Sequence, residues 1–154
     1  MEHILDAPTD VEKKLNYAGF WIRFAAYMID GILLWVVNTL ITLAFFGSMG
    51  ILSPVNPGNV GFAFLPMIIS LAINIFYFVA FESSSKQATL GKMAVGIKVG
   101  NRFGEQLSFG NALGRYVGKI LSAITLTIGF MMAGWDDKKQ ALHDKLANTY
   151  VYYK

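Results

Sequence analysis

An arginine and an aspartate lie inside the first long apolar stretch of this chain, where charged side chains are costly. The stretch covers residues 20–46, and Asp30 follows Arg23 by two helical turns, so both side chains leave one helix face about 10 Å apart. Placing a carboxylate at the centre of a membrane helix costs roughly 2.5–3.5 kcal/mol. Asp30 must therefore face protein or water and have a partner or a proton.

Two interpretations of this pair are open. In the structural one, Arg23 and Asp30 neutralise each other through a third group or water and fix the orientation of the helix. In the functional one, Asp30 exchanges a proton or binds a cation, because burial favours the neutral carboxyl and a nearby arginine favours the charged one. Asn38 falls near the Asp30 face and Asn74 lies in a later apolar stretch, so both are possible secondary polar contacts.

The composition is typical of a membrane protein. Hydrophobic residues make up 55% of the 154 residues and charged residues only 15%, and residues 31–81 contain no Asp, Glu, Lys, Arg or His. That uncharged run fits two membrane helices and a short loop. The net charge of +3 comes from basic residues that flank the apolar segments, which favours a lipid bilayer over nucleic acid as the partner.

These observations predict an all-α integral membrane protein with a small cytoplasmic β-hairpin or strand element. A polar tail covers residues 1–16, and two transmembrane helices are expected over about 18–46 and 62–81, joined by a Gly- and Pro-rich loop. A cytoplasmic segment (82–107), a third helical segment (about 108–135) and a C-terminal cytoplasmic segment (136–154) follow.

The third segment carries two different stripes. Arg115 and Lys119 lie on one, and Gly110, Gly114 and Gly118 form another that suits close packing against the first helices or against a second subunit in a homo-oligomer. The uncharged remainder, 120–135, would be roughly 24 Å long, which is short of a full crossing. We therefore expect an amphipathic helix at the cytoplasmic boundary and then a re-entrant or tilted helix. Three full crossings are the alternative.

Positive charges set the expected topology. They occur in the tail, after the second helix and at the C-terminus, and are absent from the first loop, so both termini should be cytoplasmic. Residues 94–105 alternate and then turn, which predicts a short hairpin. Residues 148–153 are also β-prone and could pair with 97–99, which would hold the C-terminus inside.

Three stretches, GFWIRF (19–24), QATLGK (87–92) and LHDKLANT (142–149), resemble in order and spacing the RDD family of bacterial integral membrane proteins, over residues 17–153. The family is named for one arginine and two aspartates, which match Arg23, Asp30 and Asp144. By composition alone, Asp144 among lysines would be a solvated surface charge. The resemblance implies the bacterial cytoplasmic membrane and an ion network of these three residues, and it predicts an Arg23–Asp144 contact at the cytoplasmic boundary with Asp30 deeper.

The resemblance also bears on two details. The family often has Gly where Asn148 stands, and both tolerate a left-handed turn. Cation/proton exchange has been proposed for some members, so Asp30 transporting a monovalent cation or proton within an oligomer is one expected function.

A non-catalytic accessory subunit with a structural Arg/Asp network is the alternative. We do not expect an enzyme, a metal site or a cofactor. His3 and His143 lack the spacing of paired metal ligands, the chain contains no Cys, and a solitary His143 among charges is predicted to lie on the surface.

Overall fold

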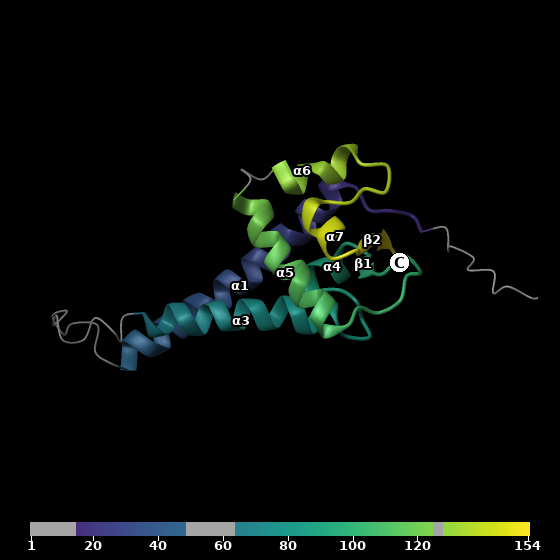
Figure 1. The fold of residues 1–154 in the computed structure, drawn as a ribbon. Helices are drawn as coiled ribbons and strands as arrows, with labels where there is room; N and C mark the ends of the chain where they lie inside the picture. The colour runs from purple at the N-terminus through teal and green to yellow at the C-terminus, as the bar shows by residue number, and fades with distance from the viewer. Residues whose placement is uncertain (1–14, 49–63, 125–127) are drawn as a thin grey trace, which may run out of the picture.

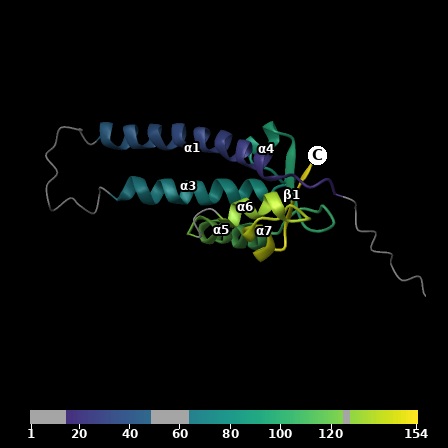
Figure 2. The same cartoon turned by 90° about the horizontal axis from the view of Figure 1, so that it is seen from above.

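Two long helices form the elongated part of the molecule. The computed structural model describes residues 15–48, 64–124 and 128–154, with α1 at Phe20–Ser48 and α3 at Leu65–Glu82. They run antiparallel and side by side (Figures 1 and 2), and both are long and apolar enough to cross a membrane. The two predicted long helices are therefore present. The expected tail and first loop fall mostly on residues 1–14 and 49–63, outside the described residues.

Local chemistry explains where α3 begins and ends. Pro66 occupies the first turn, where its missing N–H has no helical acceptor to lose. At the other end the hydroxyl of Ser83 donates to the Val79 carbonyl (2.7 Å) and that of Ser84 donates to the Phe81 carbonyl (2.7 Å). Glu82 is thus the last residue of an otherwise uncharged helix, at the end where the short helices and the sheet lie.

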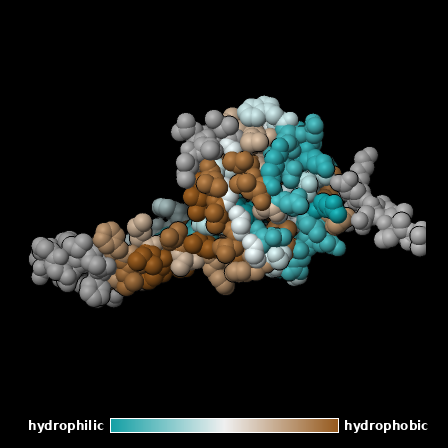
Figure 3. All heavy atoms as spheres, viewed as in Figure 1, coloured by the Kyte–Doolittle hydropathy of each residue, from teal (hydrophilic) through white to brown (hydrophobic). Residues whose placement is uncertain are grey.

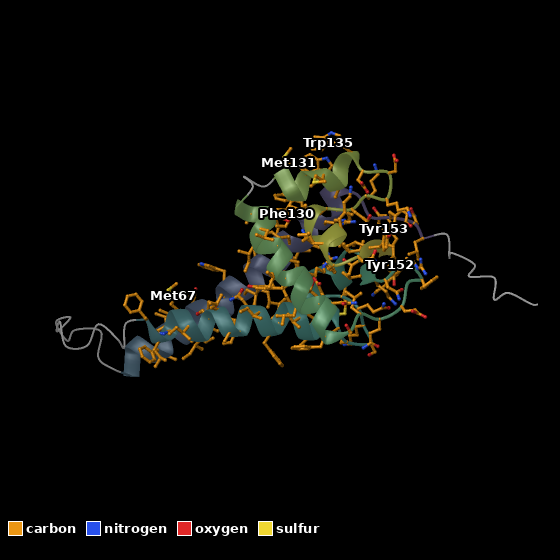
Figure 4. The ribbon with its side chains drawn as sticks, viewed as in Figure 1. Met67, Phe130, Met131, Trp135, Tyr152 and Tyr153 are labelled. Carbon is orange, nitrogen blue, oxygen red and sulfur yellow. The ribbon has the colours of Figure 1, made fainter. Side chains whose placement is uncertain are left out.

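The third predicted segment is two helices. α5 spans Phe109–Ile124 and α6 spans Ile128–Trp135, with residues 125–127 between them outside the described part. α5 packs against α3 and α7 (Leu142–Leu146), and α6 lies against α1, α5 and α7. Figure 4 shows Met131 and Trp135 on the outer side of α6, where both are exposed. This segment therefore packs against the long helices at the end where α1 begins and α3 ends.

A two-stranded sheet joins distant parts of the chain. β1 (Ile97–Gly100) pairs antiparallel with β2 (Tyr150–Tyr153), with Ile97 opposite Tyr153. This confirms the predicted pairing of the C-terminal strand. The predicted hairpin within 94–105 is wrong: β1 is followed by a turn in which the Asn101 side-chain oxygen accepts from the backbone N–H of Phe103 and Glu105, but residues 101–105 form no second strand. β1 then pairs with β2 instead.

The start of the described chain adds to this sheet. The Ala18 N–H donates to the Val151 carbonyl (2.9 Å), and the Tyr153 N–H donates to the Asn16 carbonyl (2.9 Å), so residues 16–18 lie along the free edge of β2. Residues 15 and 16 therefore belong to the fold, not to a polar tail. The buried core beneath contains Ala18, Ala26, Ile97, Val99, Leu107 and Val151.

The surface divides along the long axis. Figure 3 shows apolar side chains over the long helices and α5, and hydrophilic ones at the end where the sheet and the C-terminus lie. Exposed aromatic and aliphatic residues on α1 and α3, such as Trp35 and Phe76, are unusual for a water-facing surface. They suit contact with lipid.

Candidate charge network

Asp30 is held by neutral donors. Its carboxylate is 1% exposed, and it accepts hydrogen bonds from the Tyr77 hydroxyl (2.7 Å), the Thr89 hydroxyl (2.6 Å) and the Gly91 N–H (2.7 Å). Thr89 is the N-cap of the short helix α4 (Leu90–Ala94), and the Leu90 N–H donates to the Tyr77 hydroxyl at 3.1 Å. One carboxylate of α1 thus joins α3 and α4.

Gly91 permits this contact. A Cβ at that position would lie 2.2 Å from the Ala26 carbonyl oxygen and 2.8 Å from the Asp30 carboxyl carbon. Any other residue would therefore separate α4 from α1. Backbone packing, as well as hydrogen bonding, leaves Asp30 without access to solvent.

Asp144 lies at the start of α7 and is completely buried. One oxygen pairs with Arg23 and also accepts from the Ala141 N–H (3.1 Å), and the other pairs with Arg115. Burial alone would raise the pKa of this carboxyl, but Arg115 and Arg23 outweigh it and hold the pKa well below the usual range. Asp144 is therefore ionised and joins α7 to α1 and α5.

Glu82 forms the third centre, at the end of α3. One oxygen accepts from the ammonium groups of Lys92 (2.5 Å) and Lys119 (2.9 Å), and the other lies 2.9 Å from Nε of Arg115. Arg115 also donates to the Thr149 hydroxyl (2.7 Å). Because Arg115 contacts both Glu82 and Asp144, it connects the two carboxylates into one network.

Burial lowers the pKa of three groups in this network. Burial lowers the pKa of Lys92 to about 7, despite the opposing effect of Glu82, and lowers the pKa of Lys119 in the same way. The pKa of His143 falls to about 3, again mainly because of burial. His143 is therefore neutral near pH 7, with Nε2 3.3 Å from Asp144 and Nδ1 3.4 Å from the Ser122 hydroxyl.

The structure brings most of the predicted site residues together. The Arg23–Asp144 contact is confirmed, and Arg115 and Lys119 join the same network. The predicted neutralisation of Asp30 by Arg23 is wrong, since Arg23 bonds instead to Asp144 and to the carbonyls of Ala18 (2.8 Å) and Lys139 (2.5 Å). Asp30 needs no arginine because three donors already satisfy it.

The surface positions predicted for Asp144 and His143 from their charged neighbours are also wrong. Both are buried, because α7 packs against α5. The neighbouring lysines had suggested that this segment is exposed to solvent. Gly118 makes this approach possible, since a Cβ there would lie 3.0 Å from the His143 Cβ. Gly118 thus packs within its own chain, and only Gly110 and Gly114 of the predicted glycine stripe are exposed.

Asn38 and Asn74 lie away from the charge network. They line a groove of about 300 Å³ between α1 and α3, together with Tyr27, Gly31, Leu34, Trp35 and Phe78. The Asn74 side chain donates to the Ser70 carbonyl (2.7 Å), and the Asn38 side-chain oxygen is buried without a hydrogen-bond partner among the described residues. They are polar groups of the helix pair and not ligands of Asp30.

Sequence reasoning missed several contributors. The sequence alone assigns no role in the network to Glu82, Tyr77, Thr89, Gly91 or Lys92. The sequence holds one signal for Glu82. It is the first charged residue after a long uncharged run, so it should lie at the same end of the helix pair as Arg23. The contacts of Tyr77 and Thr89 with Asp30 depend on α4 packing against α1, and no local sequence pattern predicts that packing.

Comparisons with known proteins agree with this architecture. The RDD family matches residues 17–148. The chain is 42% identical over 149 residues to Uncharacterized protein YxaI of Bacillus subtilis (strain 168), covering 89% of this chain and 97% of that protein. It is 29% identical over 144 residues to Uncharacterized membrane protein YteJ of the same organism, covering 90% and 82%. No solved structure matches. With its two long apolar helices, the chain is a membrane protein that belongs to the RDD family.

Proposed function

We propose that this chain is a non-catalytic accessory membrane subunit whose buried carboxylates fasten a cytoplasmic group of short helices to two membrane-spanning helices. One observation carries the proposal: Asp30, Glu82 and Asp144 are each bonded to at least two other segments of the fold. Together they connect α1, α3, α4, α5 and α7. Each of their oxygens is hydrogen-bonded or ion-paired, which is the pattern of a structural network.

We place both termini of this multi-pass protein on the cytoplasmic side. In Figure 1 the first described residues and the C-terminus lie at the same end of the helix pair. Lys86, Arg102, Lys138, Lys145 and Lys154 are exposed residues of the segments gathered there, in keeping with the excess of positive charge on cytoplasmic segments.

We place α5 in the membrane boundary, without a third crossing. Arg115 and Lys119 point inward to Glu82, whereas Leu113, Val117 and Ile120 are exposed. A helix with buried charges and an exposed apolar face of this kind can lie at the level of the headgroups, its apolar face against the acyl chains.

Spin labels test that placement cleanly because the chain contains no cysteine. Single-cysteine variants at Leu113 and Val117 should carry labels that dissolved oxygen reaches better than a water-soluble nickel chelate does. A label at Arg102, which is exposed at the hydrophilic end, should show the reverse. Labels at Leu113 and Val117 that favour the nickel chelate would place α5 in water and contradict this part of the proposal.

Cation/proton exchange at Asp30 is a second candidate. It is favoured by the oxygen atoms around the site, since the Tyr77 and Thr89 hydroxyls lie 2.7 and 2.6 Å from the carboxylate. Hydroxyl and carboxylate oxygens are ligands that hard cations accept. Two spans are too few to enclose a path alone, so this candidate requires a homo-oligomer.

Proton-coupled cation flux in proteoliposomes separates the two functions. Purified wild type and folded Asp30→Asn would be assayed with Na⁺, K⁺ and Li⁺ in turn. The accessory role predicts no flux in either protein. Flux in the wild type that is lost in the folded variant would replace the accessory role by transport through Asp30.

A further inference from the structure

The charge network contains more cations than carboxylates. Among the described residues, its ion pairs join Arg23, Lys92, Arg115 and Lys119 to two acids, Glu82 and Asp144. The third buried acid, Asp30, accepts hydrogen bonds from neutral groups. A partly buried group with surplus positive charge is unfavourable unless a further anion approaches it or a lysine loses its proton.

Of the three cations paired with Glu82, the two lysines have the more exposed side chains. The Lys119 side chain is 18% exposed and that of Lys92 is 10% exposed, whereas the Arg115 side chain is 2% exposed. The Lys119 ammonium also lies 4.4 Å from the ring centre of Phe78, one turn before the end of α3. In the orientation proposed above, Lys119 therefore lies near the level where α3 leaves the acyl chains and the headgroups begin.

We propose that Lys119, with Lys92 beside it, binds the phosphate of an anionic phospholipid headgroup. The phosphate supplies the negative charge that the network lacks, and each ammonium group can approach it as a compact point charge. Burial is the main cause that lowers the pKa of both lysines, and the nearby Arg115 lowers it further, so a bound phosphate anion would favour their charged form. The inference rests on the proposed function in one respect, the position of α5 at the membrane boundary.

A lipid suits this site better than free phosphate because α5, the helix that carries Lys119, also exposes apolar side chains. Ile120 and Val117, on the same helix, are exposed and apolar. The acyl chains attached to a headgroup at Lys119 would cover such side chains, whereas inorganic phosphate would leave them in contact with water. The cytoplasmic leaflet, where we place this end of the molecule, also carries anionic lipids.

Thermal unfolding of the purified full chain in a neutral detergent tests the proposal. Dihexanoyl phosphatidylglycerol should raise the unfolding temperature saturably, by roughly 5 °C, because it binds the folded state. Dihexanoyl phosphatidylcholine and inorganic phosphate should each produce less than half of that rise. An equal rise with phosphatidylcholine would overturn the requirement for net negative charge, and an equal rise with inorganic phosphate would overturn the lipid as the source.

Variants assign the effect to this site. Lys119→Gln should lose most of the rise in unfolding temperature, and Lys119→Arg should keep it. Lys154 is exposed at the C-terminus, so Lys154→Gln should match the wild type. If Lys119→Gln does not fold, lipid phosphorus that co-purifies with Lys119→Arg and wild type is measured instead, and one bound anionic lipid per chain is expected. An undiminished rise in folded Lys119→Gln, or no bound anionic lipid, would contradict the site, whereas the spin labels on α5 test the membrane position independently.

Discussion

Arg23 in the first turns of α1 and Asp144 in α7 form a buried ion pair across 121 positions of the chain. Arg23 also donates to the Lys139 carbonyl, so both the start of α7 and the loop before it are held against α1. Because Arg23 lies near one end of a membrane-length helix, this pair requires the C-terminal segment to lie at that same end. The contact thus connects the fold of residues 136–154 to the topology of the protein in the membrane.

Arg115 should not be replaceable by lysine. Its guanidinium contacts Glu82 through Nε and Asp144 through a terminal nitrogen, and a single ammonium group cannot reach both carboxylates. We expect Arg115→Lys to lower the free energy of unfolding by about 3 kcal/mol, the lower end for breaking a buried pair. Thermal or denaturant unfolding in detergent checks this, with the exposed Arg102→Lys as the control. Equal stability of the two variants would mean that the bridge is unimportant.

Asp30→Asn should fold with only a modest loss of stability. The amide oxygen can accept from Tyr77 and Gly91, and the amide nitrogen can donate to the Thr89 hydroxyl, which rotates to accept. Asp30→Leu removes every acceptor and should cost about 3 kcal/mol or more, since it leaves several buried donors unpaired. Unfolding temperatures of both variants check this. If Asp30→Asn were as unstable as Asp30→Leu, the carboxylate charge itself would be needed for folding.

Gly91→Ala should weaken the attachment of α4 to α1. The new Cβ would meet the Ala26 carbonyl oxygen at 2.2 Å, and backbone must move to relieve that contact. We expect a loss of about 1–3 kcal/mol, as in overpacked cores, measured by thermal unfolding. Gly31→Ala in α1 is the matched control, because nothing lies within 4 Å of its added Cβ. A Gly91→Ala protein as stable as this control would show that the close approach is absent.

His143 should make the protein less stable in mild acid. Its pKa in the fold is about 3, against about 6.5 for an unfolded histidine. Between these values the unfolded chain binds the extra proton, so stability present above pH 6.5 falls as the pH falls towards 3. Unfolding temperatures from pH 6.5 to 4.5 should decline more steeply for wild type than for His143→Gln. That range lies above the ordinary pKa of aspartate, which keeps Asp144 out of the comparison. Equal slopes would contradict a buried neutral His143.

The long helices could be predicted from the sequence because their signal is local. Two long apolar stretches, charged only at Arg23 and Asp30 before α3 ends, specify α1 and α3 within a few residues. The pairing of β1 with β2 followed from β-branched and aromatic residues in both segments. The left-handed backbone at Asn148 (φ 49°) likewise follows from the residue type.

The network could be predicted only in part because it depends on how short segments fold back. Asp144 and His143 lie among lysines, and nothing local indicates that α7 packs on α5 and buries them. Arg115 and Lys119 could be predicted as polar contacts, but their shared partner Glu82 ends a different helix. Long-range contacts of this kind are set by tertiary packing and not by spacing along the chain.

Hydrogen exchange of the folded protein in lipid nanodiscs, compared between wild type and Asp144→Asn, tests the central claim most directly. Loss of the Asp144 charge removes the carboxylate paired with Arg23 and leaves Arg115 paired with Glu82 alone. If the carboxylates fasten the cytoplasmic helices, backbone amides of α7 and β2 will exchange at least about tenfold faster in the variant, while α1 and α3 keep their protection. Unchanged protection of α7 in a folded, membrane-inserted Asp144→Asn protein would contradict the account.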